Sequence, residues 1–152
     1  MNRSPEVISN RESIIDQLEL LIDELTAQRP WLNRIPEAQL FGKALESDLS
    51  LFQMYEEMER QERDHLAVFS LVSPSGAART SSIDALLDRL IAERRTLTDH
   101  LKSSSLQFWQ SHLMKEGKST VEEVAFKISQ TDAAVLRTIA ERLYESQISF
   151  SK

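Results

Sequence analysis

Residues 128–143 read ISQTDAAVLRTIAERL and place a row of apolar side chains along one face of a helix. Ile128, Val135 and Ile139 follow one another at steps of seven and four residues, which is the spacing of one helical face. Thr131 and Asp132 fall on or beside the same row, where apolar residues are expected. The stretch therefore predicts a core-facing helix with a polar position in its middle.

Three further segments share this periodicity, and no segment alternates as a β-strand does. They cover approximately residues 9–28, 36–69 and 83–101, and the last helix is expected to begin at residues 119–120. Four amphipathic helices can bury their apolar rows together as an antiparallel bundle. The sequence thus predicts an all-α fold, a four-helix bundle formed by one domain, residues 1–152.

The predicted connections have recognisable compositions. Residues 73–82, SPSGAARTSS, contain Pro, Gly and small polar residues and form the predicted long loop between helices 2 and 3. Residues 103–118 form the irregular connection between helices 3 and 4. The charged run EMERQERDH, residues 57–65, is interpreted as the solvated end of the second helix.

Local signals predict where the helices begin and end. In a capping box, a Ser or Thr and the Glu three residues later each bond to the other's backbone N–H. Ser9 with Glu12 fits this pattern, and so do two overlapping pairs before the fourth helix, Ser119 with Glu122 and Thr120 with Glu123. Pro30 is expected to end the first helix, because the residue before a proline avoids the helical region.

Composition excludes several classes of function. The chain of 152 residues has a net charge of −6, which disfavours nucleic acid and anionic membrane surfaces as partners. No apolar run approaches the roughly 18 residues of a transmembrane helix. The first ten residues lack the apolar core of a signal peptide, so the cytoplasm is the expected location. Without cysteine there can be no disulfide and no cysteine nucleophile.

Catalytic and metal-binding motifs are not found in the sequence. The three histidines, at positions 65, 100 and 112, do not pair at helical spacing, and a single Glu62-x-x-His65 is half of what a di-iron bundle requires. No Gly-x-Ser-x-Gly turn occurs. We therefore predict no catalytic residue, no metal and no cofactor. Arg94 and Arg95, interleaved with Glu93, are interpreted as part of a solvated face.

Residues 86–136, LLDRLIAERRTLTDHLKSSSLQFWQSHLMKEGKSTVEEVAFKISQTDAAVL, resemble the third and fourth helices of the DinB-like superfamily. That group includes thiol-dependent transferases and maleylpyruvate isomerases. Its members have an arginine-bearing helix, an aromatic, a Gly-x-x-Thr turn and a last helix with His-Asp-x-x-His-Leu. The corresponding residues here are Thr131-Asp132-Ala133-Ala134-Val135-Leu136, so the Asp and Leu match and both histidines are replaced.

The resemblance implies the fold of the family, but the histidine ligands that its metal-dependent reaction requires are replaced in this chain. The family's third histidine ligand lies early in its second helix, and Asp48 occupies the corresponding place by spacing from the helix start. One carboxylate with Thr131 and Val135 cannot supply the three protein ligands that a catalytic zinc site usually has. We therefore expect Asp48, Thr131, Asp132 and Val135 to mark a vestigial ligand-binding site. Thr131 could instead bond to the carbonyl of Lys127 in its own helix.

The favoured hypothesis is a non-catalytic DinB-like bundle that acts by binding a small ligand, a partner protein or a second copy of itself. The alternative is a transferase or hydrolase of the same superfamily with a displaced or absent metal site, for which Asp48, Asp132, Glu62 and His65 are the candidates. A third interpretation is a helical interaction protein of another superfamily, favoured if the long connection between helices 2 and 3 is missing.

Overall fold

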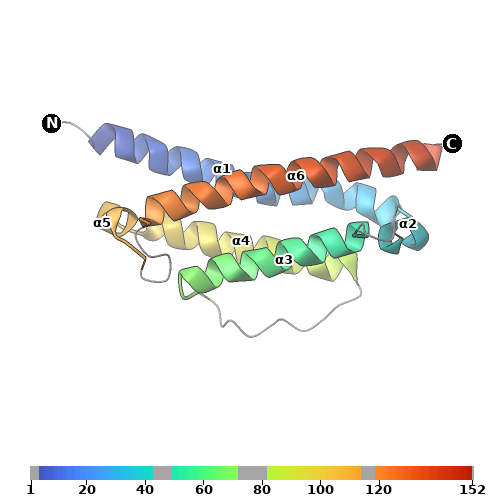
Figure 1. Cartoon of the computed structure of the whole chain (residues 1–152), viewed down its shortest axis with the longest axis horizontal. Coiled ribbons are helices and arrows are strands. Elements are labelled where there is room, and N and C mark those ends of the chain that lie inside the picture. Colours follow the sequence, from blue (N-terminus) through green and yellow to red (C-terminus); the bar gives the residue numbers. More distant parts are fainter. Residues whose placement is uncertain (1–3, 43–48, 72–81, 114–118, 152) are drawn as a thin grey trace.

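A computed structural model describes residues 4–42, 49–71, 82–113 and 119–151 of the chain. These residues form six α-helices and no β-strand (Figure 1), so the prediction of an all-α fold is confirmed. Four helices are long: α1 (Ser4–Arg34), α3 (Leu51–Val68), α4 (Ile83–Ser103) and α6 (Val121–Ser151). Two are single short turns of helix at opposite ends of the molecule: α2 (Glu37–Phe41) and α5 (Leu106–Gln110).

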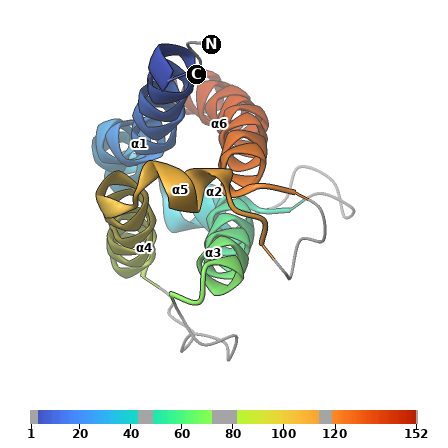
Figure 2. The same cartoon turned by 90° about the vertical axis from the view of Figure 1, so that its left-hand side faces the viewer.

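The four long helices surround one interior. Helix α1 packs against α4 and α6, and α3 packs against the same two helices (Figure 2). Helices α1 and α6 run in one direction, and α3 and α4 run in the other (Figure 1). The antiparallel prediction is therefore right for the pairs α1–α4 and α3–α6 and wrong for α1–α6 and α3–α4. The reason is that α3 and α4 both begin at the end of the molecule where α1 finishes.

Helix α1 is longer than predicted at both ends. Pro30 lies inside the helix, and Ser9 is not an N-cap because the helix already begins at Ser4. A proline costs the helix one backbone hydrogen bond, which tertiary contacts can offset. Leu32 is buried beyond the proline, and Arg29 forms ion pairs with Asp84 and Asp88 of α4 just before it. These contacts hold the last turn of α1 against the protein.

The predicted second helix is two helices, α2 and α3. The backbone of Gly42 is extended after α2, and Ser50 begins α3 with a complete capping box, in which its hydroxyl accepts from Gln53 N–H and the Gln53 side chain accepts from Ser50 N–H. This Ser-x-x-Gln pattern was present in the sequence and marks the true start. Asp48 and Leu45 lie outside the described residues.

The later boundaries agree better with the sequence. Helix α4 starts after Ser82, whose hydroxyl accepts from Ala85 N–H, and most of the predicted loop 73–82 lies outside the described residues. The N-terminus of α6 has the Thr120–Glu123 capping box, one of the two predicted alternatives. Of the helices in the described part of the chain, none combines the length and the apolar character needed to cross a membrane.

The apolar core is divided into two clusters, one toward each end of the molecule. The α2-side cluster includes Leu25, Tyr55, Leu87 and Ile139, and the α5-side cluster includes Leu18, Leu66, Leu97, Trp109 and Ile128. Both clusters draw residues from all four long helices. The side chains between them are polar, and they form the site described next.

Candidate functional site

Three of the four predicted site residues lie in the described part of α6, and they do not form one pocket. Asp132 is buried and faces α4. The Thr131 hydroxyl donates to the carbonyl of Lys127 at 3.0 Å, the local bond named as its alternative. Val135 packs against the α2-side cluster. Asp48, the fourth, lies outside the described residues.

Asp132 belongs to a buried ionic cluster centred on Arg94, whose side chain is 0 % exposed. The guanidinium Nε and Nη2 donate to the two Glu62 oxygens at 2.6 and 2.5 Å. Its Nη1 and Nη2 donate to the two Asp132 oxygens at 2.5 and 3.1 Å, and Nη1 also donates to the Leu18 carbonyl at 2.9 Å. A guanidinium has five N–H donors, and all five are used.

We call Glu62, Arg94, Asp132 and the Leu18 carbonyl the Arg94 layer, because it lies across the interior between the two apolar clusters. On α3, Glu62 stands between Met58 of the α2-side cluster and Leu66 of the α5-side cluster. On α4, Arg94 stands between Ile91 and Leu97 in the same way. One layer therefore joins α1, α3, α4 and α6, and the interpretation of Arg94 as part of a solvated face was wrong.

The charges in the layer follow from burial and pairing. Burial opposes ionisation of Glu62, but the hydrogen bonds and charge of Arg94 outweigh it and hold the pKa of Glu62 below its usual range. Burial raises the pKa of Asp132 above its usual value, although Arg94 opposes that shift. Burial also acts to lower the pKa of Arg94, but its two carboxylate partners outweigh that effect and raise it. The guanidinium is therefore a permanent internal cation.

The run 57–65 is not the solvated helix end that the sequence suggested, because Glu59 and Glu62 are both buried. Glu59 of α3 accepts a hydrogen bond from Arg89 of α4 at 2.6 Å. In the other direction, Arg63 of α3 donates to Glu93 of α4 at 3.1 Å. Burial, followed by the negative charge of Glu59, raises the pKa of Glu93 to about 7. The Glu93 carboxyl therefore holds its proton to higher pH than an exposed glutamate does.

His65 lies at the edge of the Arg94 layer, with 19 % of its side chain exposed and Nδ1 3.3 Å from Glu62 Oε1. Within the described ranges, no three His, Asp or Glu side chains are arranged to hold a metal ion. The buried carboxylates of Glu62 and Asp132 are bridged by the guanidinium of Arg94. The guanidinium of Arg94 is thus the cation that pairs with both carboxylates of the layer.

An open groove lies elsewhere, between the N-terminal halves of α1 and α6. It has a volume of about 290 Å³, and none of its residues was predicted as a site: Ser13, Ile14, Gln17, Glu122, Glu123 and Phe126 line it. Glu123 caps α6 through Thr120, whereas Oε1 of Glu122 is buried and has no hydrogen-bond partner. Phe126 is 49 % exposed and Ile14 is buried.

Comparison of this chain with known proteins identified no matching family model, no matching curated protein and no matching solved structure.

Proposed function

We propose that this protein is a non-catalytic, DinB-like four-helix bundle that acts by binding. The spacing of the helices supports the resemblance: residues 69–82 lie between α3 and α4, which is the long connection expected between helices 2 and 3. The sequence features that carried the resemblance also fall on structurally important positions. The arginine-bearing helix supplies Arg94, and the Asp of the family motif is Asp132, its buried partner.

The observation that carries the proposal is the saturation of the Arg94 layer. A metal-dependent transferase or hydrolase needs ligands with free electron pairs and an open coordination position. Here each carboxylate of Glu62 and Asp132 accepts two hydrogen bonds from one guanidinium. Breaking these pairs to admit a metal ion would leave a buried, uncompensated arginine, which costs several kcal/mol.

The groove between α1 and α6 is the binding site we propose. Its buried Glu122 oxygen lacks a donor, and a buried acceptor without a partner is unfavourable until a ligand supplies one. The half-exposed ring of Phe126 and the side chain of Ile14 offer apolar contact beside that carboxylate. Carboxylate, aromatic face and aliphatic wall together suit a small organic ammonium ion.

The experiment has two separate readouts. Elemental analysis of the purified protein should find far less than one transition-metal ion per chain. A stoichiometric metal that is lost in His65→Ala would overturn the non-catalytic assignment.

Isothermal titration with 2-phenylethylammonium tests the groove. We expect binding that weakens at least tenfold in Glu122→Gln and is unchanged in Glu141→Gln, an exposed position on the same helix. Equal binding by all three proteins, or none by the wild type, would reject the groove.

A further inference from the structure

The described part of the chain exposes six large hydrophobic side chains, and four of them lie on α1 and α6. On α1, Leu20 is 51 % and Trp31 47 % exposed, and on α6, Phe126 is 49 % and Tyr144 65 % exposed. Helices α1 and α6 lie side by side on one side of the molecule (Figure 2). Such a concentration of exposed aromatic and aliphatic residues is typical of an interaction surface.

Helical geometry places these four side chains along the α1–α6 seam. Phe126 and Tyr144 are eighteen residues apart, which is five whole turns, so they share one face of α6. Leu20 and Trp31 are eleven residues apart, or about three turns. Leu20 also follows Ser13 and Gln17 on the edge of α1 that lines the groove with Phe126. We call this surface the α1–α6 face.

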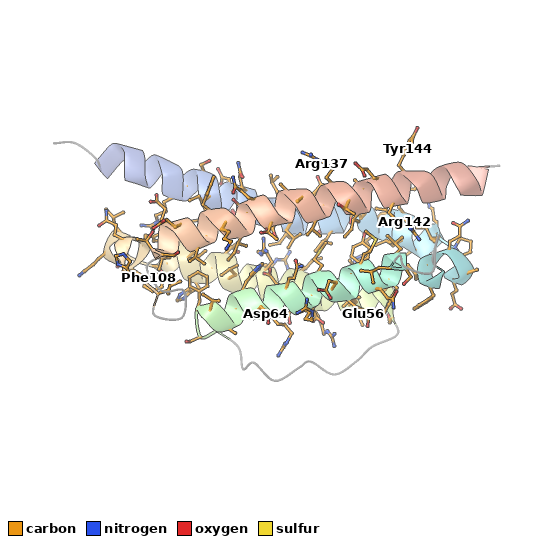
Figure 3. The ribbon with its side chains drawn as sticks, in the orientation of Figure 1. Glu56, Asp64, Phe108, Arg137, Arg142 and Tyr144 are labelled. Atoms are coloured by element: carbon orange, nitrogen blue, oxygen red, sulfur yellow. The ribbon has the colours of Figure 1, made fainter. Side chains whose placement is uncertain are left out.

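The exposed row on α6 has a symmetric pattern. Phe126, Ala133, Arg137 and Tyr144 are separated by seven, four and seven residues, so the row is the same length on either side of residue 135. Arg137 and Tyr144 point away from α3 and α4 (Figure 3). A two-fold interface requires a self-complementary surface, in which residue i meets residue j and j meets i. The α6 row meets this requirement in an antiparallel pairing.

We propose that a second copy of this chain covers the α1–α6 face, with the two α6 helices packed antiparallel about residue 135. Phe126 of each copy then contacts Tyr144 of the other, and Arg137 lies across the small side chain of Ala133. Antiparallel packing also sets the helix dipoles in their favourable relative orientation. A parallel pairing would instead place Phe126 against Phe126 and align the dipoles.

The size of the face agrees with a stable dimer. Eighteen residues of helix span about 27 Å, and two helices are about 20 Å wide, which gives roughly 540 Å² in projection for each copy. Projecting side chains raise the accessible area above this figure. A specific interface of ordinary size buries about 800 Å² on each partner, so the α1–α6 face is of the required order.

This inference deepens the proposed function, on which its link to the ligand rests. Phe126 both lines the groove and belongs to the symmetric row. In the dimer, Tyr144 of the second copy therefore lies at the mouth of the groove and contributes to the site. Ligand binding and dimerisation should then favour each other to the same degree, because coupling between two binding events is reciprocal.

Sedimentation velocity at 1 to 100 µM protein tests the dimer. We expect a species of twice the chain mass of 17.4 kDa, lost in Tyr144→Glu and retained in Leu49→Glu, a control at an exposed leucine outside the α1–α6 face. A wild type that stays monomeric over this range overturns the proposal, and so does a dimer that survives Tyr144→Glu.

The natural lack of cysteine allows a test of the register. Phe126→Cys and Tyr144→Cys proteins are prepared separately and treated with a short bismaleimide, alone and after mixing. Cross-linking that occurs only in the mixture supports the antiparallel pairing. Cross-linking of the Phe126→Cys protein by itself overturns it. Both measurements are made without a ligand, so failure of the dimer and failure of the 2-phenylethylammonium titration are distinguishable.

Discussion

The Arg94 layer and the α1–α6 groove are both polar regions of one small protein, but they differ in how their polar groups are satisfied. In the layer, five donors meet the four carboxylate oxygens and one carbonyl. In the groove, Oε1 of Glu122 is buried without a donor. A saturated buried cluster fixes how helices pack, whereas an unsatisfied group at an open surface is available to a ligand. The most polar part of the interior is therefore not where we place the function.

The largest expected effect comes from removing the cation of the layer. Arg94→Ala leaves Glu62 and Asp132 buried without their partner, and breaking a buried ion pair in this way costs about 3–5 kcal/mol. Urea denaturation should measure this loss in the free energy of unfolding. Arg95→Ala is the matched control, because Arg95 is exposed, and its effect should stay within about 0.5 kcal/mol.

A second variant keeps this prediction testable if Arg94→Ala does not fold. Replacing the whole layer, with Arg94→Met, Glu62→Leu and Asp132→Leu, removes all three charges together. Well-packed apolar substitutes for a buried ionic cluster are often neutral or stabilising. We expect the triple variant to be more stable than Arg94→Ala. The reverse order would show that the layer holds the helices by something other than charge pairing.

The carboxyl of Glu93 gives the next largest effect, which depends on pH. The pKa of Glu93 is raised to about 7 in the folded protein, so folding favours its protonated form. This contribution to stability is present at low pH and is lost as the pH rises through about 7. Glu93→Gln should flatten the fall in unfolding free energy between pH 5 and 8 by roughly 1–2 kcal/mol, whereas Glu56→Gln should not.

Thermal or urea unfolding at a series of pH values in constant ionic strength measures this slope. A wild type whose stability is flat or rises across pH 5 to 8, with no change in Glu93→Gln, would contradict the raised pKa of Glu93. It would also mean that the ion pair with Arg63 outweighs the burial of Glu93.

Some features that depend on neighbours in sequence were predicted correctly, although the Ser9–Glu12 pattern did not begin α1 and the Ser50–Gln53 box was missed; features that depend on packing were not predicted. The start of α4 is local and was predicted, and the Thr120–Glu123 cap is one of the two alternatives predicted for α6. Pro30 was expected to end α1, but the contacts made by Leu32 and Arg29 with other helices continue it. Local propensity is overridden where an adjacent turn is firmly buried.

The Arg94 layer could have been suspected from one further pattern. Glu62, Arg94 and Asp132 each occupy a place in an apolar row, but only Asp132 was predicted to lie on such a row. Their pairing joins residues 32 and 38 positions apart in the chain. Helical periodicity shows that a charged side chain faces inward, but not which charge from another helix it meets. The groove left no such signal, because its shape depends on how α1 lies against α6.

A smaller effect is expected at a buried neutral pair that resembles the layer in being satisfied. The Tyr55 hydroxyl donates to Gln28 Oε1 at 2.6 Å between α3 and α1. Tyr55→Phe keeps the ring and leaves a buried acceptor unpaired, so it should lower the free energy of unfolding by about 1 kcal/mol. Tyr144→Phe, at an exposed tyrosine, should change it by less than the error of the urea measurement. Equal effects at both tyrosines would refute this account.

The smallest effect on stability is expected where we place the function. Glu122→Gln removes a charge from the first turn of α6, where the helix dipole favours acidic residues, but Oε1 of Glu122 has no hydrogen-bond partner to lose. The free energy of unfolding should change by no more than about 0.5 kcal/mol, whereas Glu62→Gln should cost several times as much. If Glu122→Gln destabilises the protein as strongly as Glu62→Gln, the Glu122 carboxylate is a structural group. The distinction between a closed layer and an open groove then fails, because both would hold the helices together.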